Sequence, residues 1–205
     1  QRGTIETVLP NGYALPRDAS DLLNAMDGAA ACLVSGESGA GKSALVRAVL
    51  DEHFPEARQI WLGPEALQSA LSEASREQIG LTAPLADLLP ASMAAQNILV
   101  VDAVERADSD TIARLARLLR RIADGFLAGG PTWQIIAIGQ RAGFEAHLDP
   151  LTAFIGNRVV AVTPPEPADV RNALLTVPSL AEHAYDDAFI AIVGNLRTLA
   201  WIVSA

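Results

Sequence analysis

The sequence predicts an α/β fold in which a five-stranded, mainly parallel sheet lies between two layers of helices and precedes a small helical subdomain. Short apolar runs alternate with segments of helical periodicity over the first 165 residues, which is typical of parallel sheets. A glycine-rich loop joins the first of these runs to a helix. Beyond residue 165 the pattern is helical throughout. We therefore expect a core over residues 1–165 and the start of a helical subdomain, truncated by the chain end, over residues 166–205.

Local patterns place the elements before residue 95. Residues 1–16 show little periodicity and predict an irregular lead-in, whereas Asp27-Gly28 ends the first helix. Pro64 suits the first turn of a helix because its fixed φ is already helical, and Pro90 interrupts the last helix of this half. The predicted elements are a helix over 17–26, a strand over 31–35, a helix over 44–52, a strand over 58–62 and helices over 65–74 and 85–93.

The second half continues the alternation. Polar residues at 108–110 can cap a long helix whose apolar side chains fall on one stripe. The most apolar stretch, residues 188–205, carries Gly194, Asn195 and Arg197 in its middle, so we expect two packed helical pieces instead of a membrane span. The predicted elements are strands over 98–102, 134–138 and 158–162 and helices over 111–126, 168–175, 181–193 and 196–204.

The composition combines enough apolar residues for a full core with an acidic balance. Half of the 205 residues are hydrophobic, and the formal net charge is -9. Because nucleic-acid grooves usually need a basic face, we expect no nucleic-acid partner. The single cysteine, Cys32, lies in a predicted strand and favours a buried, inert thiol in a cytoplasmic protein. The chain shows no signal peptide and begins without methionine, so we expect a fragment of a longer protein.

The glycine-rich loop is the strongest functional signal. It reads Gly36-Glu37-Ser38-Gly39-Ala40-Gly41-Lys42-Ser43 and fits the pattern G-x-x-x-x-G-K-S/T at every fixed position. In such a loop main-chain N–H groups surround a phosphate, and glycines allow its close approach. The lysine reaches the β- and γ-phosphates, the serine hydroxyl binds Mg²⁺, and the helix N-terminus at Ala44 adds donors. We therefore expect ATP or ADP with Mg²⁺ as ligands of residues 36–44, with Lys42 also catalytic.

Two acidic residues follow the third predicted strand. The apolar run 98–101 ends in Asp102, as in the second motif of nucleoside triphosphatases, whose carboxylate holds Mg²⁺ beside the loop serine. We therefore assign Asp102 and Ser43 to the metal site. A hydrolase also needs a carboxylate that orients or deprotonates the attacking water. Glu105 is the best candidate for this catalytic role.

Three arginines are candidates for contacts with the nucleotide. Arg141 follows the fourth predicted strand, where a guanidinium could read the γ-phosphate, and we assign it a catalytic role. Arg17 lies near the start of the first predicted helix and could contact the nucleotide from there. Arg158 begins the fifth predicted strand, and a structural role is expected for it.

The order of these motifs resembles the STAND class of ATPases, which are relatives of AAA+ proteins and include the NACHT and plant-resistance-type switches. The resemblance runs from about Leu15 to Trp201. In one of its segments Leu196 replaces a proline that contacts the nucleotide in the family. The segments that carry it are the loop at 36–43, the acidic signature at 101–106, the sensor strand at 138–141, the proline-containing start of the helical subdomain at 162–166 and the G-x-P-x-x-L-type stretch at 194–200.

The resemblance implies a regulatory switch that binds and hydrolyses ATP. Hydrolysis in this family is slow or triggered by a partner, and activation involves self-association. The resemblance also implies effector and sensor domains elsewhere in a longer polypeptide, and bacterial members often serve in signalling or anti-phage defence. The γ-phosphate would then set how the C-terminal helices pack against the sheet.

Other functions remain open at this point. A P-loop kinase would transfer the γ-phosphate to a small acceptor, but such enzymes usually have a lid with several arginines, and residues 63–95 contain only Arg76. A static nucleotide-binding scaffold would not need the intact Lys42, Asp102 and Glu105. A GTPase would need an N-K-x-D-like segment, and a DNA-acting AAA+ ATPase would need basic pore or groove residues that the acidic balance disfavours.

Overall fold

The computed structural model describes residues 4–92, 94–127, 133–140 and 149–204. The chain folds into two compact units, each built from separate segments. The first, which we term the loop unit, comprises Gln1–Leu23, Gly36–His53 and Ala161–Ala205. The second, the sheet unit, comprises Asn24–Ser35 and Phe54–Val160.

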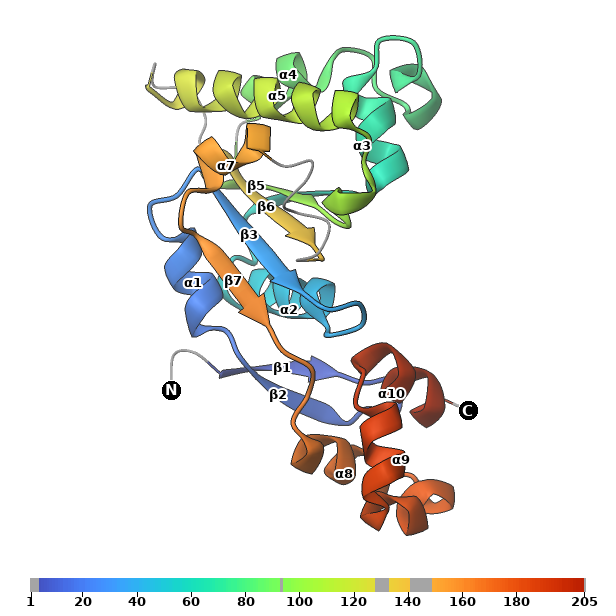
Figure 1. Ribbon diagram of the computed structural model, residues 1–205. Helices are drawn as coiled ribbons and strands as arrows, with labels where there is room; N and C mark the ends of the chain where they lie inside the picture. Colours follow the sequence, from blue (N-terminus) through green and yellow to red (C-terminus); the bar gives the residue numbers. More distant parts are fainter. Residues whose placement is uncertain (1–3, 93, 128–132, 141–148, 205) are drawn as a thin grey trace. The chain divides into compact units, whose positions relative to one another are not determined.

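The five-stranded sheet lies mainly in the sheet unit. Its strands follow the order β4-β5-β6-β3-β7, and β6 pairs in parallel with β5 on one side and with β3 on the other (Figure 1). In this register Arg58 lies opposite Asn97, and Asn97 lies opposite Trp133. The strands are β3 (Ala31–Gly36), β4 (Arg58–Leu62), β5 (Asn97–Val101), β6 (Trp133–Gly139) and β7 (Val159–Val162). The predicted α/β fold with a five-stranded sheet is confirmed.

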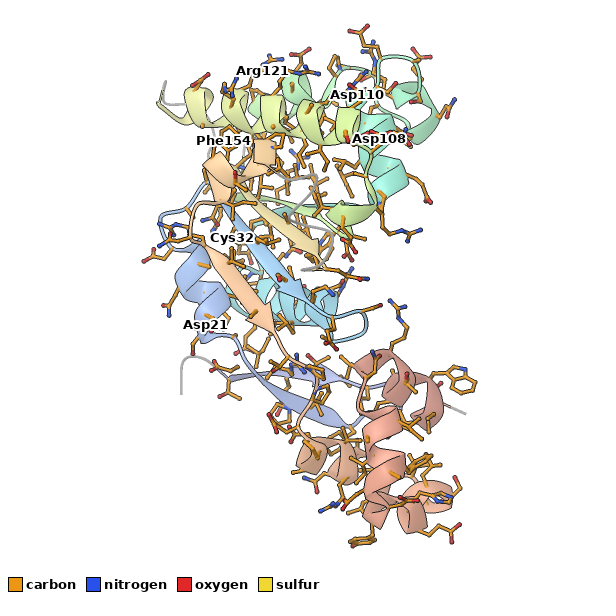
Figure 2. The ribbon with its side chains drawn as sticks, in the orientation of Figure 1. Asp21, Cys32, Asp108, Asp110, Arg121 and Phe154 are labelled. Carbon is orange, nitrogen blue, oxygen red and sulfur yellow. The ribbon has the colours of Figure 1, made fainter. Side chains whose placement is uncertain are left out.

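Helices of the sheet unit pack on one face of this sheet. Their apolar side chains share a core with alternate residues of the strands, such as Leu33, Leu99 and Ile135. The predicted stripe of the longest helix contributes Leu115 and Leu118, and Phe154 packs against the same core, beneath that helix in Figure 2. The helical elements are α3 (Pro64–Leu71), α4 (Leu85–Leu88), α5 (Ser109–Leu127), α7 (Asp149–Ile155) and the 3₁₀ turns η1 (Arg76–Ile79), η2 (Leu89–Ala91) and η3 (Val104–Arg106).

The loop unit combines a β-hairpin with helices from both ends of the chain. Leu9 and Leu15 from the hairpin form a core with Val170, Val193 and Leu199 from the C-terminal helices. These helices are drawn beside the hairpin in Figure 1. The elements are β1 (Thr4–Val8), β2 (Ala14–Asp18), α2 (Lys42–His53), α8 (Pro167–Leu175), the 3₁₀ helix η4 (Pro178–Tyr185), α9 (Asp187–Val193) and α10 (Leu196–Val203), while α1 (Ser20–Met26) begins in this unit and ends in the sheet unit.

The N-terminal predictions are wrong in two respects. Residues 4–18 form the antiparallel hairpin β1–β2 and not an irregular lead-in. Its turn uses Gly12 at φ 84, which is the conformation that an Asn-Gly pair between two strands favours. The helix predicted from residue 17 begins only at Ser20, because the Asp18 carboxylate accepts a 2.9 Å hydrogen bond from the Ser20 amide. Arg17 therefore lies in β2, opposite Ile5, and not in a helix.

The C-terminal helices divide at polar residues that cap them. The helix predicted over 181–193 splits at Asp186, whose carboxylate accepts hydrogen bonds from the Ala188 and Phe189 amides and thereby starts α9. The two helical pieces predicted after residue 188 are confirmed as α9 and α10. Among the described residues, no helix combines the length and the apolar character needed to cross a membrane.

Candidate functional site

The glycine-rich loop links the end of β3 to the start of α2 at Lys42. Gly39 and Gly41 have φ values of 77 and 91, which L-residues with a Cβ rarely adopt. Space also excludes side chains at these positions. A Cβ on Gly36 would overlap the Val162 carbonyl oxygen, and one on Gly41 would overlap the Leu196 side chain. Backbone conformation therefore favours glycine at positions 39 and 41, and the close Val162 carbonyl oxygen favours it at position 36.

The polar groups of this loop are arranged to receive an anion. The Lys42 ammonium donates to the carbonyl oxygens of Gly36 at 3.1 Å and Glu37 at 2.7 Å, so its charge is held over the loop. Within the described part of the chain, the main-chain amides of Ser38 and Gly39 donate to no main-chain carbonyl. Since α2 begins at the loop, the positive end of its dipole adds to these donors.

Arg17 of β2 forms a hydrogen bond with the same loop. Its guanidinium donates to the carbonyl oxygen of Ala40 at 3.0 Å and to that of Thr163 at 2.9 Å. Burial lowers the pKa of Arg17, and the negative charge of Asp169 opposes this shift. The structure thus places Arg17 at the loop backbone, as a link between β2, the loop and the segment that follows β7.

The start of α10 is hydrogen-bonded directly to the loop. The Asn195 side chain donates from Nδ2 to the Ser38 carbonyl oxygen at 2.6 Å, and the Leu196 amide donates to the Gly39 carbonyl oxygen at 2.9 Å. A Cβ on Gly39 would overlap the Asn195 amide. Sequence reasoning singled out the stretch 194–200 through its resemblance to a nucleotide-contacting segment, but it did not identify Asn195.

In the sheet unit, Asp102 and Glu105 follow the carboxyl end of β5. Asp102 is fixed by its amide, which donates to the Leu62 carbonyl oxygen at 2.9 Å. Ala103 has a φ of 55, which turns the chain into η3 and carries Glu105. Among the described residues, no group forms a hydrogen bond with the buried Oε2 of Glu105. A buried carboxylate oxygen without a donor suits a group that must bind a water or substrate proton.

Strand pairing defines which strand ends meet. Ser35 of β3 lies opposite Gly139 of β6, and β5 pairs with β6 on its other side in the same direction. The carboxyl ends of β3, β5 and β6 therefore share one edge of the sheet, where ligands of open α/β sheets bind. Along the chain, Ser35 leads into the loop and Val101 into Asp102.

Three residues that were singled out from the sequence remain. Arg141 lies outside the described residues. Arg158 donates to the carbonyl oxygens of Ala25 at 3.1 Å and Asp27 at 2.6 Å, which supports the structural role expected for it. Cys32 is buried, and desolvation raises the pKa of its thiol to about 12, in agreement with an inert cysteine.

No group of three or more His, Cys, Asp or Glu side chains in the described part of the chain could hold a metal ion by itself. Mg²⁺ that is bound together with a nucleotide usually takes only one or two protein ligands, besides phosphate oxygens and waters. A hydroxyl at Ser43 and a carboxylate at Asp102 are ligands of the required kind.

These features define the class of the protein. A β-strand, a glycine-rich loop with positive φ angles, an ammonium over the loop and a helix N-terminus constitute a P-loop site on an α/β fold. The model of the family described as ABC transporter matches residues 25–141, which include this loop, Asp102 and Glu105. Because the match covers more than half of the 205 residues, the chain belongs to this family of P-loop ATPases.

Solved structures with a similar fold include a domain of the replication initiation protein DnaA, an Orc1 protein and Cdc6p. Domain III of DnaA from Thermotoga maritima matches with a TM-score of 0.63 and 17% identity over 90% of this chain and 78% of that chain. Orc1 from Aeropyrum pernix, solved in complex with DNA, matches with a TM-score of 0.56 and 17% identity over 88% of this chain and 55% of that chain. Cdc6p from Pyrobaculum aerophilum matches with a TM-score of 0.57 and 17% identity over 85% of this chain and 52% of that chain.

These likenesses, at 17% identity, show that the α/β fold is shared and show the fold alone. The chain spans about half the length of the Orc1 and Cdc6p chains that it matches. No curated protein has a sequence similar enough to match this chain.

Proposed function

We propose that this chain is an ATP-binding and ATP-hydrolysing switch module of a STAND-type regulatory protein, with sensor and effector domains in a longer polypeptide. The observation that carries the proposal is the direct hydrogen bonding of α10 to the phosphate loop through Asn195 and Leu196. A nucleotide that moves the loop would therefore also move the start of a C-terminal helix. The family resemblance supports a role in signalling or bacterial defence, and the single cysteine supports a cytoplasmic location.

In this proposal each residue of the site has its own role toward ATP. Main-chain amides of residues 37–44 donate to the phosphates, and Lys42 places its positive charge on the β- and γ-phosphates. Ser43 and Asp102 would hold Mg²⁺, which neutralises charge on the phosphates when it is bound. Glu105 positions the attacking water and accepts its proton, and Arg141 reads the γ-phosphate.

The switch depends on a peptide group that has two roles. The carbonyl oxygen of Ser38 accepts from Asn195, and the amide of the same peptide group, which belongs to Gly39, donates to no main-chain carbonyl of a described residue and is available for a phosphate. A peptide plane is rigid, so a rotation that aims an amide at a phosphate also moves a carbonyl. ATP and ADP would then favour different positions of α10 through their different contacts with the loop.

The C-terminal elements of the loop unit also offer a surface for partners. Large apolar side chains are exposed there, and Tyr185, Ile192 and Trp201 each exceed 70% exposure. Exposed apolar side chains in one region are typical of interaction sites. We propose that a second copy of the chain, or a neighbouring domain of the same polypeptide, covers them.

ATP turnover by active-site variants tests the proposal. We expect Lys42→Ala to lose nucleotide affinity, whereas Glu105→Gln should bind ATP and fail to hydrolyse it. Glu65→Gln is the matched control, because Glu65 is an exposed carboxylate at the start of α3 in the same unit as Glu105. Full hydrolysis by Glu105→Gln would disprove the assigned base. Transfer of the γ-phosphate to an added acceptor would identify a kinase instead.

A DNA-acting AAA+ ATPase is the second candidate. The fold similarity to DnaA, and to Orc1 solved in complex with DNA, favours it, whereas the net charge of -9 opposes it. Binding of single- and double-stranded oligonucleotides at several salt concentrations distinguishes the two functions. A DNA-acting protein should show affinity that falls steeply with salt and ATPase activity that DNA stimulates.

A further inference from the structure

The sheet unit contains a cavity of about 580 Å³ that shares no residue with the phosphate loop. It is bounded by residues 70–74 and 76, by residues 84–86 and by residues 114–121 in the middle of α5. Among the described residues, four arginines line it, namely Arg76, Arg114, Arg117 and Arg121, and Glu73 is the only acidic residue that does so. A cationic cavity stands out in a chain whose net charge is -9. Figure 2 labels Arg121 on α5 at this surface.

Arg76 provides the most specific sign of a ligand. Its Nε is buried, and no hydrogen-bond acceptor for it exists among the described residues. The backbone holds the residue in place, because the Arg76 amide donates to the Ser72 carbonyl oxygen at 3.2 Å and its own carbonyl accepts from Leu81 at 3.1 Å. A buried guanidinium N–H is normally satisfied, so its position in a cavity calls for an acceptor from outside the described chain.

The other three arginines retain much of their capacity for an anion. Arg114 donates to Asp110 at 2.8 Å and to the Leu71 carbonyl oxygen at 3.1 Å, and Arg121 donates to Asp87 at 3.1 Å. Both aspartates are more than half exposed. Exposed ion pairs of this kind are weak and can exchange partners. Arg117 forms no hydrogen bond or ion pair with another described residue, and it is exposed.

We propose that this cavity binds a small molecule that carries a phosphate group on an apolar or planar body. A guanidinium group can donate to two phosphate oxygens at once. A phosphate group is therefore a better ligand for a cluster of arginines than a single carboxylate. Leu71, Leu85 and Leu118 supply apolar surface in the same lining. The volume lies in the range of small-molecule sites. An extended polyanion such as nucleic acid fits less well, because Glu73 lines the cavity and Asp87 and Asp110 form ion pairs with two of its arginines.

Titration with phenyl phosphate, followed by nuclear magnetic resonance of the arginine Nε–Hε groups, tests this site. The phosphate loop is kept saturated with ADP and Mg²⁺, and the Lys42→Ala variant provides a second background without a functional loop. We expect the Nε–Hε signals of Arg76 and Arg117 to shift in both backgrounds. Arg117→Ala should weaken binding about tenfold, since one charge-assisted hydrogen bond is lost. Arg76→Lys should weaken it similarly.

The matched control is Arg120→Ala, because Arg120 is exposed on α5 but does not line the cavity. Arg120→Ala should leave the affinity unchanged, and benzyl alcohol, which lacks the phosphate, should not bind. Equal effects of Arg117→Ala and Arg120→Ala would overturn the proposal, as would shifts that occur only without ADP. Displacement of phenyl phosphate by a short oligonucleotide at lower concentration would also overturn it, in favour of a nucleic-acid site. If Arg76→Lys does not fold, Arg117→Ala alone decides the test.

Discussion

The Nδ2 atom of Asn195 donates a 2.6 Å hydrogen bond to the carbonyl oxygen of Ser38. The Oδ1 atom of the same amide accepts from the amides of Arg197 and Thr198 at 3.0 and 3.4 Å and so caps α10. One side chain therefore starts a helix and holds the phosphate loop. Since Ser38 and Gly39 belong to the residues that would contact phosphate, this relationship connects the ligand site to α10 within the loop unit.

The two roles of Asn195 can be separated with Asn195→Asp. Aspartate keeps the cap of α10 and suits the positive end of its dipole, but it has no N–H for the Ser38 carbonyl. We expect the free energy of unfolding to change by less than about 1 kcal/mol. ATP affinity should fall about tenfold, because a carboxylate beside the phosphates is repelled. Calorimetric titration and denaturant unfolding measure both quantities. Asn24→Asp, at an exposed helical position, is the control, and an unchanged ATP affinity would contradict the role of Asn195.

Gly39→Ala should destabilise the protein through both backbone strain and contact with Asn195. The left-handed backbone alone costs about 1–3 kcal/mol, and the added methyl overlaps the Asn195 amide. Gly12→Ala is the matched control, because Gly12 has φ 84 and open space around it. Denaturant unfolding of the single and double variants should show that Asn195→Ala relieves part of the cost of Gly39→Ala but none of the cost of Gly12→Ala. Strict additivity at both sites would argue against the contact.

Arg17→Lys should weaken the loop unit although the charge is kept. An ammonium cannot reproduce the two hydrogen bonds of the guanidinium to the Ala40 and Thr163 carbonyl oxygens. We expect a loss of about 1–3 kcal/mol in the free energy of unfolding, since acceptors in a partly buried site lose their donor. Arg197→Lys, at an exposed position, should have no comparable effect. Equal free energies of unfolding for the two variants would show that the hydrogen bonds of Arg17 do not stabilise the loop unit.

Asp108 should make the free energy of unfolding depend on pH. A hydrogen bond from the Thr111 amide, 2.7 Å long, lowers the pKa of Asp108 below its ordinary value of 3.8. A depressed pKa means that the stabilisation is complete above the unfolded-state pKa and is lost as the pH falls through the folded-state value. Asp108→Asn should therefore be less stable than the wild type near neutral pH, and the difference should vanish in acid. Guanidinium denaturation across this range measures it, with Asp124→Asn as the control on the same helix. A difference that persists in acid would exclude the charge as its cause.

The single thiol should be unreactive in the folded protein. Cys32 is buried in β3, and desolvation raises the pKa of its thiol to about 12. Because the thiolate is the reactive species, iodoacetamide should fail to modify the native chain at neutral pH and should modify one site after unfolding. Mass spectrometry detects both outcomes. Rapid modification of the native protein would show that this end of β3 opens readily.

Several features of the protein could be predicted from local sequence. The loop at 36–43, the apolar strand that ends at Asp102 and the stripe of α5 each depend on neighbouring residues, and the structure has them where they were expected. The sequence does not predict the hairpin β1–β2, because Thr7 is polar but buried and Val8 is apolar but 65% exposed, so the apolar residues do not follow the alternating burial of β1.

The sequence by itself determined the class of ligand site, because a phosphate cradle requires glycines and a lysine at fixed spacing. Tertiary structure alone decided what holds that cradle: Asn195 reaches Ser38 from 157 residues away, and Arg17 reaches Thr163 from 146. It likewise brings Arg76 to the arginines of α5. The physical reason is that hydrogen bonds and charge clusters between distant segments depend on how the chain returns on itself, which no local periodicity encodes.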